Sequence, residues 1–250
     1  MAIDRRSIRV LAAGVSAVAI LMAGNSSVVR GQAAVADLAA DPAPYPAATD
    51  PNDPRTLSDQ GLIIGWGWQR IDSSTSIDRF KAIAQGGFHR LALKTNSSIL
   101  GWGGNEYGQA RAPAGNDFIA IAAGYSHSLA LKKDGSIVGW GGTATPPPGN
   151  DFIVIAAGDD HSLALKKNGS IVGWGFNRTG QATPPDGNDF IAIAAGMFHS
   201  LALKKDGSIV GWGWNDYGQA KPPAGNDFIA IAAGGYNSLA IRRAEPIASP

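Results

Sequence analysis

The 250-residue sequence contains no cysteine, and only 16% of its residues are charged. The absence of cysteine excludes disulfides, thiolate metal sites and a cysteine nucleophile. The 21 basic and 20 acidic residues nearly cancel, so the net charge gives no electrostatic reason to expect a nucleic-acid partner, which requires a basic surface. It also lacks a phosphate-binding loop, a dinucleotide fingerprint and a serine–histidine–acid signature. We therefore expect no nucleic-acid partner and no cofactor, and we expect a protein that is not an enzyme.

What the sequence has in abundance is glycine, with 33 residues, and an internal repeat. Segment 118–141 reads FIAIAAGYSHSLALKKDGSIVGWG; similar copies begin at Phe152 and Phe190, a more divergent one at Phe80, and part of another at Phe228. The tryptophans that end the copies are 36, 38, 34 and 38 residues apart, at Trp66, Trp102, Trp140, Trp174 and Trp212. A nearly fixed period of this size predicts a repeat architecture.

Residues 1–36 have the pattern of a secretory signal peptide. Three arginines precede a mostly apolar run, 10–24, and Ala34-Val35-Ala36 is a small-residue cleavage site. The run is shorter than the roughly 20 residues that span a membrane, although an uncleaved N-terminal anchor is the alternative. We expect an exported protein, periplasmic or extracellular, without a membrane attachment after cleavage. Residues 37–57 are rich in Pro, Ala and Asp and predict a linker, 58–243 the repeat domain, and 244–250 a C-terminal tail.

Each repeat predicts three short antiparallel strands. In 118–123 and 127–132 bulky and small residues alternate, as in strands that present different side chains on their two faces. Asp134-Gly135 predicts a two-residue hairpin turn with positive φ at both positions. Residues 136–140 form the third strand, and the following Asn-x-x-Gly-Gln and prolines predict a connection rather than a fourth strand.

A small sheet of this kind cannot bury both faces alone, so the copies must stack. The fold class expected is all-β, a β-propeller of short three-stranded blades. Residues 61–67, GLIIGWG, match a third strand without the first two, whereas 228–243 match two strands without the third. We predict that these N- and C-terminal strands share one blade and close a ring of five.

The repeated Ala-Ala-Gly-x-x-His-Ser-Leu-Ala-Leu-Lys and Asp-Gly-Ser-Ile-Val-Gly-Trp-Gly-x-Asn-x-x-Gly-Gln resemble the repeat of the regulator of chromosome condensation family. The resemblance covers residues 61–242. Members commonly have seven blades, and eukaryotic members act on a small GTPase and chromatin. The short period and the predicted export are more similar to the bacterial branch that includes the propeller-type β-lactamase inhibitors. For that branch the resemblance implies contact with a protein partner through aromatic side chains on one rim.

The strand directions place the Gly-x-x-His turns and the Gly-Trp-Gly ends on the same rim, where the copies differ most. Aromatic residues with scattered charges are typical of interface hot spots, although the repeated tryptophans also suit packing between blades. The candidate partner-binding residues are Trp68, Phe88, Trp102, Tyr107, Tyr125, Trp140, Asp159, Asp160, Trp174, Phe176, Phe198, Trp212, Trp214, Tyr217 and Tyr236.

Two polar patterns raise the question of chemistry. His89, His127, His161 and His199 occupy one position of each repeat, and Asn237 occupies it in the last. Equivalent positions of a propeller lie around a ring and do not converge on one ion, so we expect no metal site but a hydrogen bond that locks the turn within each blade. Asp159-Asp160 occurs in one copy and suits a contact, a calcium ligand or a general acid/base pair.

Taken together, the sequence predicts an exported binding scaffold that recognises a protein partner through the aromatic-rich rim, with inhibition of a cell-envelope enzyme as one form of action. The first alternative is a carbohydrate-binding propeller, in which rim aromatics stack on a glycan. The second is a hydrolase or lyase that uses Asp159 and Asp160.

Overall fold

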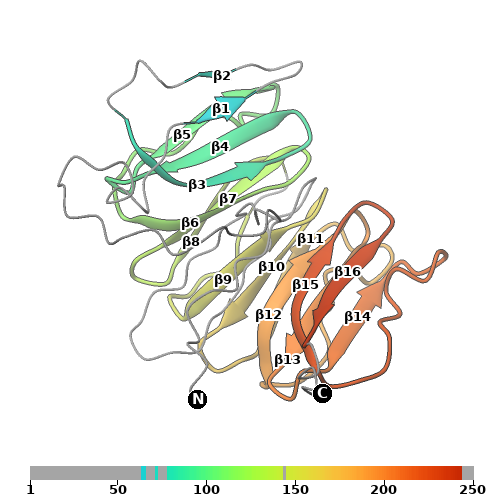
Figure 1. The fold of residues 1–250 in the computed structure, drawn as a ribbon. Helices are drawn as coiled ribbons and strands as arrows, with labels where there is room; N and C mark the ends of the chain where they lie inside the picture. Colours follow the sequence, from blue (N-terminus) through green and yellow to red (C-terminus); the bar gives the residue numbers. More distant parts are fainter. Residues whose placement is uncertain (1–62, 66–70, 73–77, 143–144, 244–250) are drawn as a thin grey trace, which may run out of the picture.

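The computed structural model describes residues 63–65, 71–72, 78–142 and 145–243. The segments predicted as signal peptide and linker, and the candidate Trp68, lie outside these ranges. Sixteen strands and no helix occur in the described part of the chain (Figure 1). Accordingly, no described segment forms a helix long and apolar enough to cross a membrane.

After a two-stranded sheet of β1 (Ile64–Gly65) and β2 (Ile71–Asp72), four three-stranded antiparallel sheets and a second two-stranded sheet follow each other in chain order, and these five are called the first to the fifth sheet below. The first sheet contains β3 (Phe80–Gln85), β4 (His89–Lys94) and β5 (Ile99–Gly103). The second contains β6 (Phe118–Ala123), β7 (His127–Lys132) and β8 (Ile137–Gly141). The third contains β9 (Phe152–Ala157), β10 (His161–Lys166) and β11 (Ile171–Gly175). The fourth contains β12 (Phe190–Ala195), β13 (His199–Lys204) and β14 (Ile209–Gly213), and the fifth contains β15 (Phe228–Ala233) and β16 (Ser238–Arg242).

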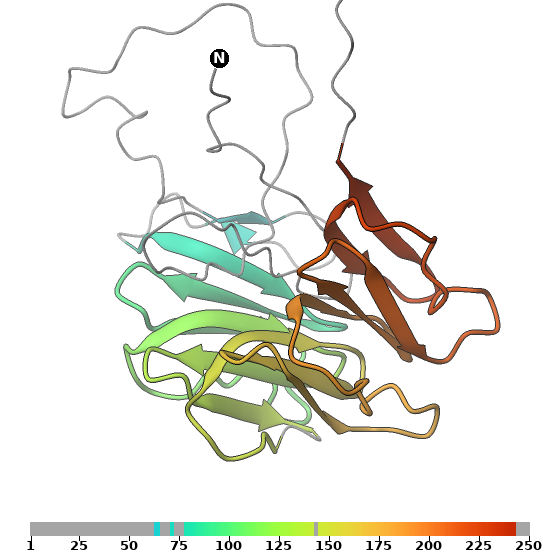
Figure 2. The same ribbon diagram turned by 90° about the horizontal axis from the view of Figure 1, so that it is seen from below.

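The predicted up-down-up order of each blade is confirmed. In the second sheet β7 lies in the middle and pairs with β6 on one side and β8 on the other. The first strands of consecutive sheets contact one another, which places them on the inner side of the curved stack seen in Figure 2. The all-β class and the architecture of short propeller blades are therefore as the sequence predicts.

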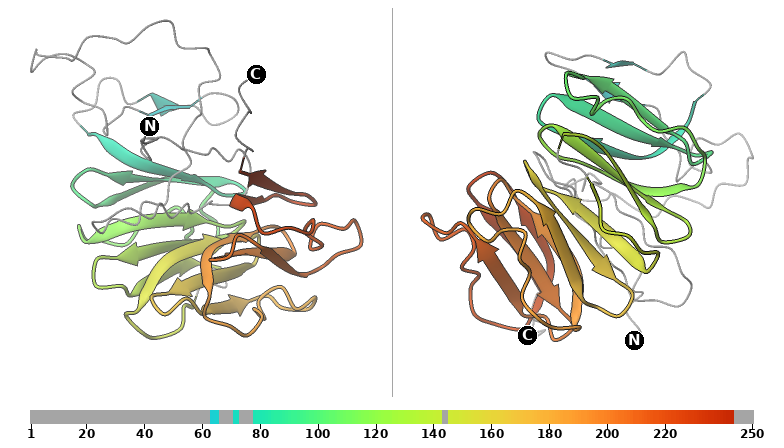
Figure 3. Two further views of the ribbon diagram at one scale, coloured as in Figure 1. Left: turned by 60° about the horizontal axis from the view of Figure 1, so that its bottom comes forward. Right: turned by 180° about the vertical axis from the view of Figure 1, so that it is seen from behind.

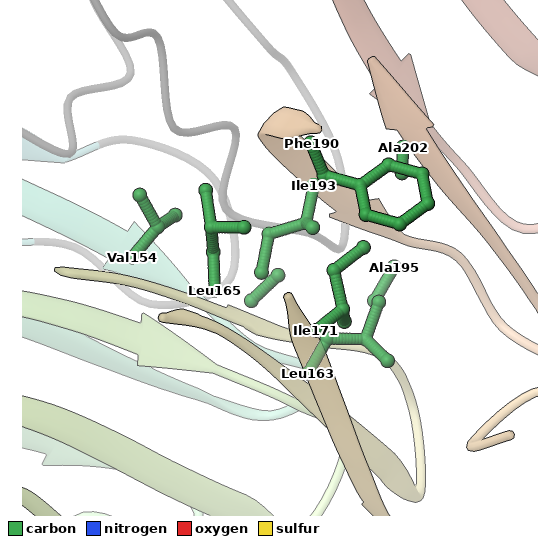
Figure 4. Close-up of a cluster of buried hydrophobic side chains, with 9 residues drawn as sticks. Val154, Leu163, Leu165, Ile171, Phe190, Ile193, Ala195 and Ala202 are labelled. Atoms are coloured by element: carbon green, nitrogen blue, oxygen red, sulfur yellow. The ribbon is translucent and has the colours of Figure 1, made fainter. Parts of the chain in front are cut away.

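The hydrophobic core lies between neighbouring sheets. One face of a blade presents two leucines, such as Leu163 and Leu165, and the next blade presents a phenylalanine and an isoleucine, Phe190 and Ile193 (Figure 4). All four side chains are at most 2% exposed. Full burial of such a side chain contributes about 1.5–3 kcal/mol, so the contact between blades stabilises the repeat.

The hairpin turns differ from the prediction. At Asp134-Gly135 only the glycine has a positive φ, 86°, and the Gly135 amide donates to the Lys132 carbonyl at 3.0 Å. The turn is thus centred on Lys133 and Asp134 with Gly135 in the left-handed region, the three-residue hairpin with a bulge rather than the two-residue type. Because Asp134 Oδ1 accepts the Ser136 amide and hydroxyl, at 2.9 and 2.7 Å, the aspartate favours this turn without positive φ.

The repeated histidines connect blades, which corrects the prediction of a bond within each blade. Each imidazole Nε2 lies 2.7–2.9 Å from a serine hydroxyl of the next sheet, in the pairs His89–Ser128, His127–Ser162, His161–Ser200 and His199–Ser238. Burial lowers the pKa of His89, His127 and His199 to about 4 and that of His161 to about 3. The rings are consequently neutral at physiological pH.

In three of these pairs the serine defines the protonation of the histidine. Ser200 Oγ donates to the Gln181 carbonyl at 2.9 Å, so it accepts from His161 Nε2–H at the same distance. Ser128 and Ser238 donate to glutamine carbonyls in the same way, at 2.8 and 2.7 Å. The hydrogen bonds therefore run from imidazole to hydroxyl to carbonyl and join the blades near the rim.

The described residues do not form the predicted shared blade, and most of segment 61–67 lies outside the described ranges. β1 (Ile64–Gly65) pairs with β2 (Ile71–Asp72), and β16 pairs only with β15. β1 and β2 lie beyond the first sheet at one end of the stack, and the fifth sheet lies at the other end (Figure 3). There, side chains that are buried inside the stack become accessible: Ile83 is 51% exposed and Leu239 70% exposed, whereas their equivalents Ile193 and Leu201 are at most 2% exposed.

The buried histidines make stability depend on pH. An unfolded histidine binds a proton below about pH 6.5, but the folded imidazole resists it until about pH 3–4, so stability is full above pH 6.5 and falls as the pH decreases. The fifth repeat has asparagine at this position, so His161→Asn is a conservative test. Between pH 7 and 4.5 we expect the free energy of unfolding of this variant to fall by about 2 to 3 kcal/mol less than that of the parent. Urea unfolding at both pH values measures this, and an equal pH dependence in variant and parent would contradict it.

Candidate functional site

The rim on which the copies differ is formed as predicted; it consists of the Gly-x-x-His turns and the residues that follow Gly-Trp-Gly, and is called the variable rim below. Backbone hydrogen bonds join these two segments in each of the four three-stranded sheets. Gly104 N donates to Phe88 O at 2.7 Å, and Trp214 N donates to Phe198 O at 2.9 Å. The variable side chains thus stand on strand ends that the sheet holds in place.

Five aromatic side chains form a continuous cluster on the variable rim, called the aromatic cluster below; they are Phe176, Phe198, Trp214, Tyr217 and Tyr236. The Trp214 ring is the centre, with centroids of Phe198, Tyr217 and Tyr236 at 6.1, 5.3 and 5.5 Å. These three contacts are edge-to-face, the favourable arrangement of aromatic pairs. Residues from three consecutive sheets therefore build one apolar surface.

The aromatic cluster has an exposed margin and a more buried centre. Tyr217 is 73%, Tyr236 54% and Phe176 37% exposed, whereas Phe198 and Trp214 are half-buried. A large aromatic centre surrounded by tyrosines whose hydroxyls can reach solvent or a partner is the composition found at interface hot spots. An exposed apolar surface of this kind indicates a binding site.

A second, smaller aromatic group lies further along the variable rim. Phe88 and Tyr125 contact edge-to-face at 5.1 Å and are 44% and 43% exposed. Tyr107 is 63% exposed and makes no ring contact within the described residues. The Asp159-Asp160 turn is the next part of the variable rim and lies between this group and the aromatic cluster. The Tyr125 amide donates to the Asp159 carbonyl at 2.9 Å.

The repeated tryptophans have a structural role. Trp140 Nε1 donates to the Gln109 carbonyl and Trp212 Nε1 to the Gln181 carbonyl, both at 2.8 Å, and both rings pack in the core between blades. Trp174 packs equivalently, but its Nε1 has no hydrogen-bond partner in the described part of the chain. The reason is the shorter connection after Gly141, which has no Gly-Gln. Trp102 Nε1 likewise has no described partner.

Sequence reasoning missed the glutamines that end the Gly-Gln motif. Gln109, Gln181 and Gln219 are at most 5% exposed. Their side-chain Oε1 atoms accept the amides of Tyr107, Thr179 and Tyr217 at 2.9–3.0 Å, so they hold the rim loops, two of which carry an exposed tyrosine. The signal was present, because glutamine recurs at this position, but only the structure shows that it connects the loop to the neighbouring serine and tryptophan.

The acidic pair does not form two exposed carboxylates. Asp159 is 7% exposed, its Oδ1 has no hydrogen-bond partner, and burial followed by the charge of Asp160 raises the pKa of Asp159 to about 6. Asp160 is half-buried, and its carbonyl accepts the Phe176 amide at 2.8 Å. Asp159 thus offers little surface to a partner. Among the described residues no group of three or more His, Asp or Glu side chains could hold a metal ion.

Comparison with known proteins gives a consistent result. A family model described as the Regulator of chromosome condensation (RCC1) repeat matches residues 80–109, 118–142, 152–181 and 190–219. No curated protein matches the sequence.

Solved propellers are similar in fold. Prp20p from Saccharomyces cerevisiae, whose structure was described with its binding to Gsp1p and histones, is 19% identical with a TM-score of 0.59 over 71% of this chain and 59% of its own. The ectodomain of the Physcomitrella patens receptor kinase CR4 is 26% identical with a TM-score of 0.56, over 63% of this chain and 48% of its own. This chain therefore spans about half to three-fifths of these proteins.

The buried Asp159 carboxylate costs stability at neutral pH. Because its folded pKa is raised from 3.8 to about 6, the folded state holds a proton that the unfolded chain has lost, and stability falls as the pH rises through this range. We expect Asp159→Asn to stabilise the protein by about 3 kcal/mol at pH 7.5 and by little below pH 4. Thermal unfolding of the variant and of the exposed-site control Asp186→Asn measures this; equal gains in both would contradict it.

The two kinds of repeated tryptophan provide a matched comparison. Trp212→Phe removes a hydrogen bond to the Gln181 carbonyl, whereas Trp174→Phe removes an indole N–H that lacks a described partner. Since both rings pack between blades, we expect Trp212→Phe to lower the free energy of unfolding by about 1 kcal/mol more than Trp174→Phe. Urea denaturation tests this, and the reverse order would show that the indole hydrogen bond does not stabilise the stack.

Proposed function

This chain belongs to the Regulator of chromosome condensation (RCC1) repeat family, and we propose that it is a non-enzymatic scaffold that binds a protein partner through the aromatic cluster. The observation that carries the proposal is the continuous ring contact from Phe176 to Tyr236 on the variable rim. The uniform parts of the repeats form the stack, and the side chains that differ gather on this surface.

The form of the aromatic cluster favours a protein over a glycan. Sugar rings stack on the open face of an aromatic side chain, whereas Trp214 is half-buried and has the edges or faces of three neighbouring rings against it. A cluster with a half-buried centre suits an apolar anchor of a protein partner, which packs against the exposed surfaces of the outer tyrosines. A partner of this class is also consistent with the yeast Prp20 structures, described with Gsp1p and histones and with Kap60.

The site of action that we propose is outside the cytoplasm, periplasmic or extracellular, on the basis of the signal-peptide pattern in residues 1–36. The partner is then a cell-envelope or secreted protein. Because the aromatic cluster joins side chains of three consecutive sheets into one surface, binding that blocks an envelope enzyme is the form of action that we propose.

The test is capture of a partner from a cell-envelope extract on the immobilised protein, followed by affinity measurement with variants. We expect the double variant Trp214→Ala/Tyr236→Ala to bind the captured protein at least 30-fold more weakly, since each hot-spot ring contributes about 2 kcal/mol. Tyr107→Ala is the matched control, because Tyr107 is equally exposed on the same rim but lies outside the aromatic cluster.

Three results would contradict the proposal. The affinity of the control could fall as much as that of the double variant, or oligosaccharides could displace the captured protein, which would favour the carbohydrate alternative. Turnover of a substrate that Asp160→Asn abolishes would favour the enzyme alternative.

A further inference from the structure

Among the described residues, the fifth sheet has no counterpart of the third strand that completes each of the other four. β5, β8, β11 and β14 pair with the middle strand of their sheets, but in the described part of the chain nothing pairs with the outer edge of β16. This edge, together with the space between it and the fourth sheet, is called the vacant third-strand position below. An unpaired edge presents backbone N–H and C=O groups to any extended chain that fits.

A cavity of about 400 Å³ occupies this position. It is lined by residues of the fourth sheet and its loop and of the fifth sheet, among them Leu201, Ile209, Gln219, Phe228, Ser238 and Ala240. At the equivalent place in the other sheets an aliphatic side chain and a tryptophan fill the core; the pairs are Leu100–Trp102, Val138–Trp140, Val172–Trp174 and Val210–Trp212. The core cluster between the fourth and fifth sheets has no such pair.

The hydrogen-bond acceptors beside this cavity also correspond to those that bind a tryptophan indole in other sheets. The Gln109 and Gln181 carbonyls each accept two hydrogen bonds, one from a serine hydroxyl and one from a tryptophan Nε1. Within the part of the chain that the structure describes, the Gln219 carbonyl accepts only the Ser238 hydroxyl, at 2.7 Å. The position that an indole N–H has in the second and fourth sheets is thus formed in the fifth, with an acceptor directed toward it.

The register of the complete sheets defines what would fit. In the fourth sheet Ser200 lies opposite Trp212, Leu201 opposite Gly211 and Ala202 opposite Val210. The same register places a tryptophan opposite Ser238, a glycine opposite Leu239 and an aliphatic residue opposite Ala240. Ala240 is accordingly exposed, whereas Ala202, which Val210 covers, is fully buried.

We propose that the vacant third-strand position binds an extended segment of the protein partner, with the pattern aliphatic–aliphatic–Gly–Trp–Gly, as an added antiparallel edge strand. Four filled copies of the same position within the molecule define this occupant. Addition of a strand to a sheet edge is an established way of recognising peptides: main-chain hydrogen bonds give affinity and side-chain pockets give specificity.

A second copy of this chain is a poorer occupant. Its third strands β5, β8, β11 and β14 are already paired in their own sheets, and its β1 is paired with β2. Tyr217 and Tyr236 line both the cavity and the aromatic cluster, so the added strand and the rim-bound part of the partner would be continuous. The inference therefore rests on the proposed function and names the recognition element of the partner.

The test uses a blocked peptide of the sequence of residues 207–213, Gly-Ser-Ile-Val-Gly-Trp-Gly, with a fluorescent label, and measures its anisotropy with the purified full-length protein. We expect saturable binding that is at least tenfold weaker when the peptide tryptophan is replaced by alanine. We expect the same loss for Ala240→Lys, which places a charged side chain in the cavity.

The matched control is Ile241→Lys. Ile241 is the next residue of β16 and 37% exposed, but it does not line the cavity, so this variant should bind the peptide as the parent does. Circular dichroism and thermal unfolding of both variants confirm that each is folded.

Several results would overturn the inference. These are absence of saturable binding up to millimolar peptide, and equal binding by Ala240→Lys and the parent. Binding that appears only in Trp66→Ala would mean that residues 61–67 of the same chain occupy the position. Peptide-induced dissociation of a dimer would mean that a second copy does. Since the readout is peptide affinity, none of these results decides whether the aromatic cluster binds a partner.

Discussion

Burial of apolar side chains between neighbouring sheets is the interaction on which this structure depends. Sheets of two or three strands of five or six residues are too small to be stable alone. Leu129 and Leu131 of the second sheet become fully buried only because Phe152 and Ile155 of the third cover them, and the same contact recurs through the stack. Each repeat therefore needs a neighbour, which explains why the leucine and phenylalanine positions are nearly uniform along the chain.

The buried polar groups near the rim also depend on the contact between neighbouring sheets. An imidazole of one sheet, a serine of the next and a glutamine carbonyl of the connecting loop form one hydrogen-bonded chain, so buried polar atoms in each blade find partners in another. Where the connection is shorter, after Gly141, the chain is incomplete, and Ser162 and Trp174 lack the glutamine carbonyl that Ser200 and Trp212 have. The loops thus contribute to the contact between blades as well as joining them.

Because the repeated residues form the contacts between sheets, the variable rim remains available for recognition. Side chains such as Phe198, Trp214 and Tyr236 stand on strand ends fixed by the stack, so their surface is preorganised and little conformational entropy is lost on binding. The ends of the stack have the opposite character. There the repeating contact stops, and Leu239 and the edge of β16 retain a capacity for packing and pairing that is used everywhere else in the molecule.

The sequence by itself determined the all-β class, the three strands of each blade and the rim to which Phe88, Phe198 and Trp214 belong, because side-chain alternation and the repeat period report local structure directly. Tertiary structure alone decided three other features: the serine partner of each histidine, the burial of Asp159, and the separate pairing of β1 and β16. The physical reason is common to all three. They depend on how one repeat lies against the next, and a sequence pattern within a repeat carries no information on the distance between atoms of different blades.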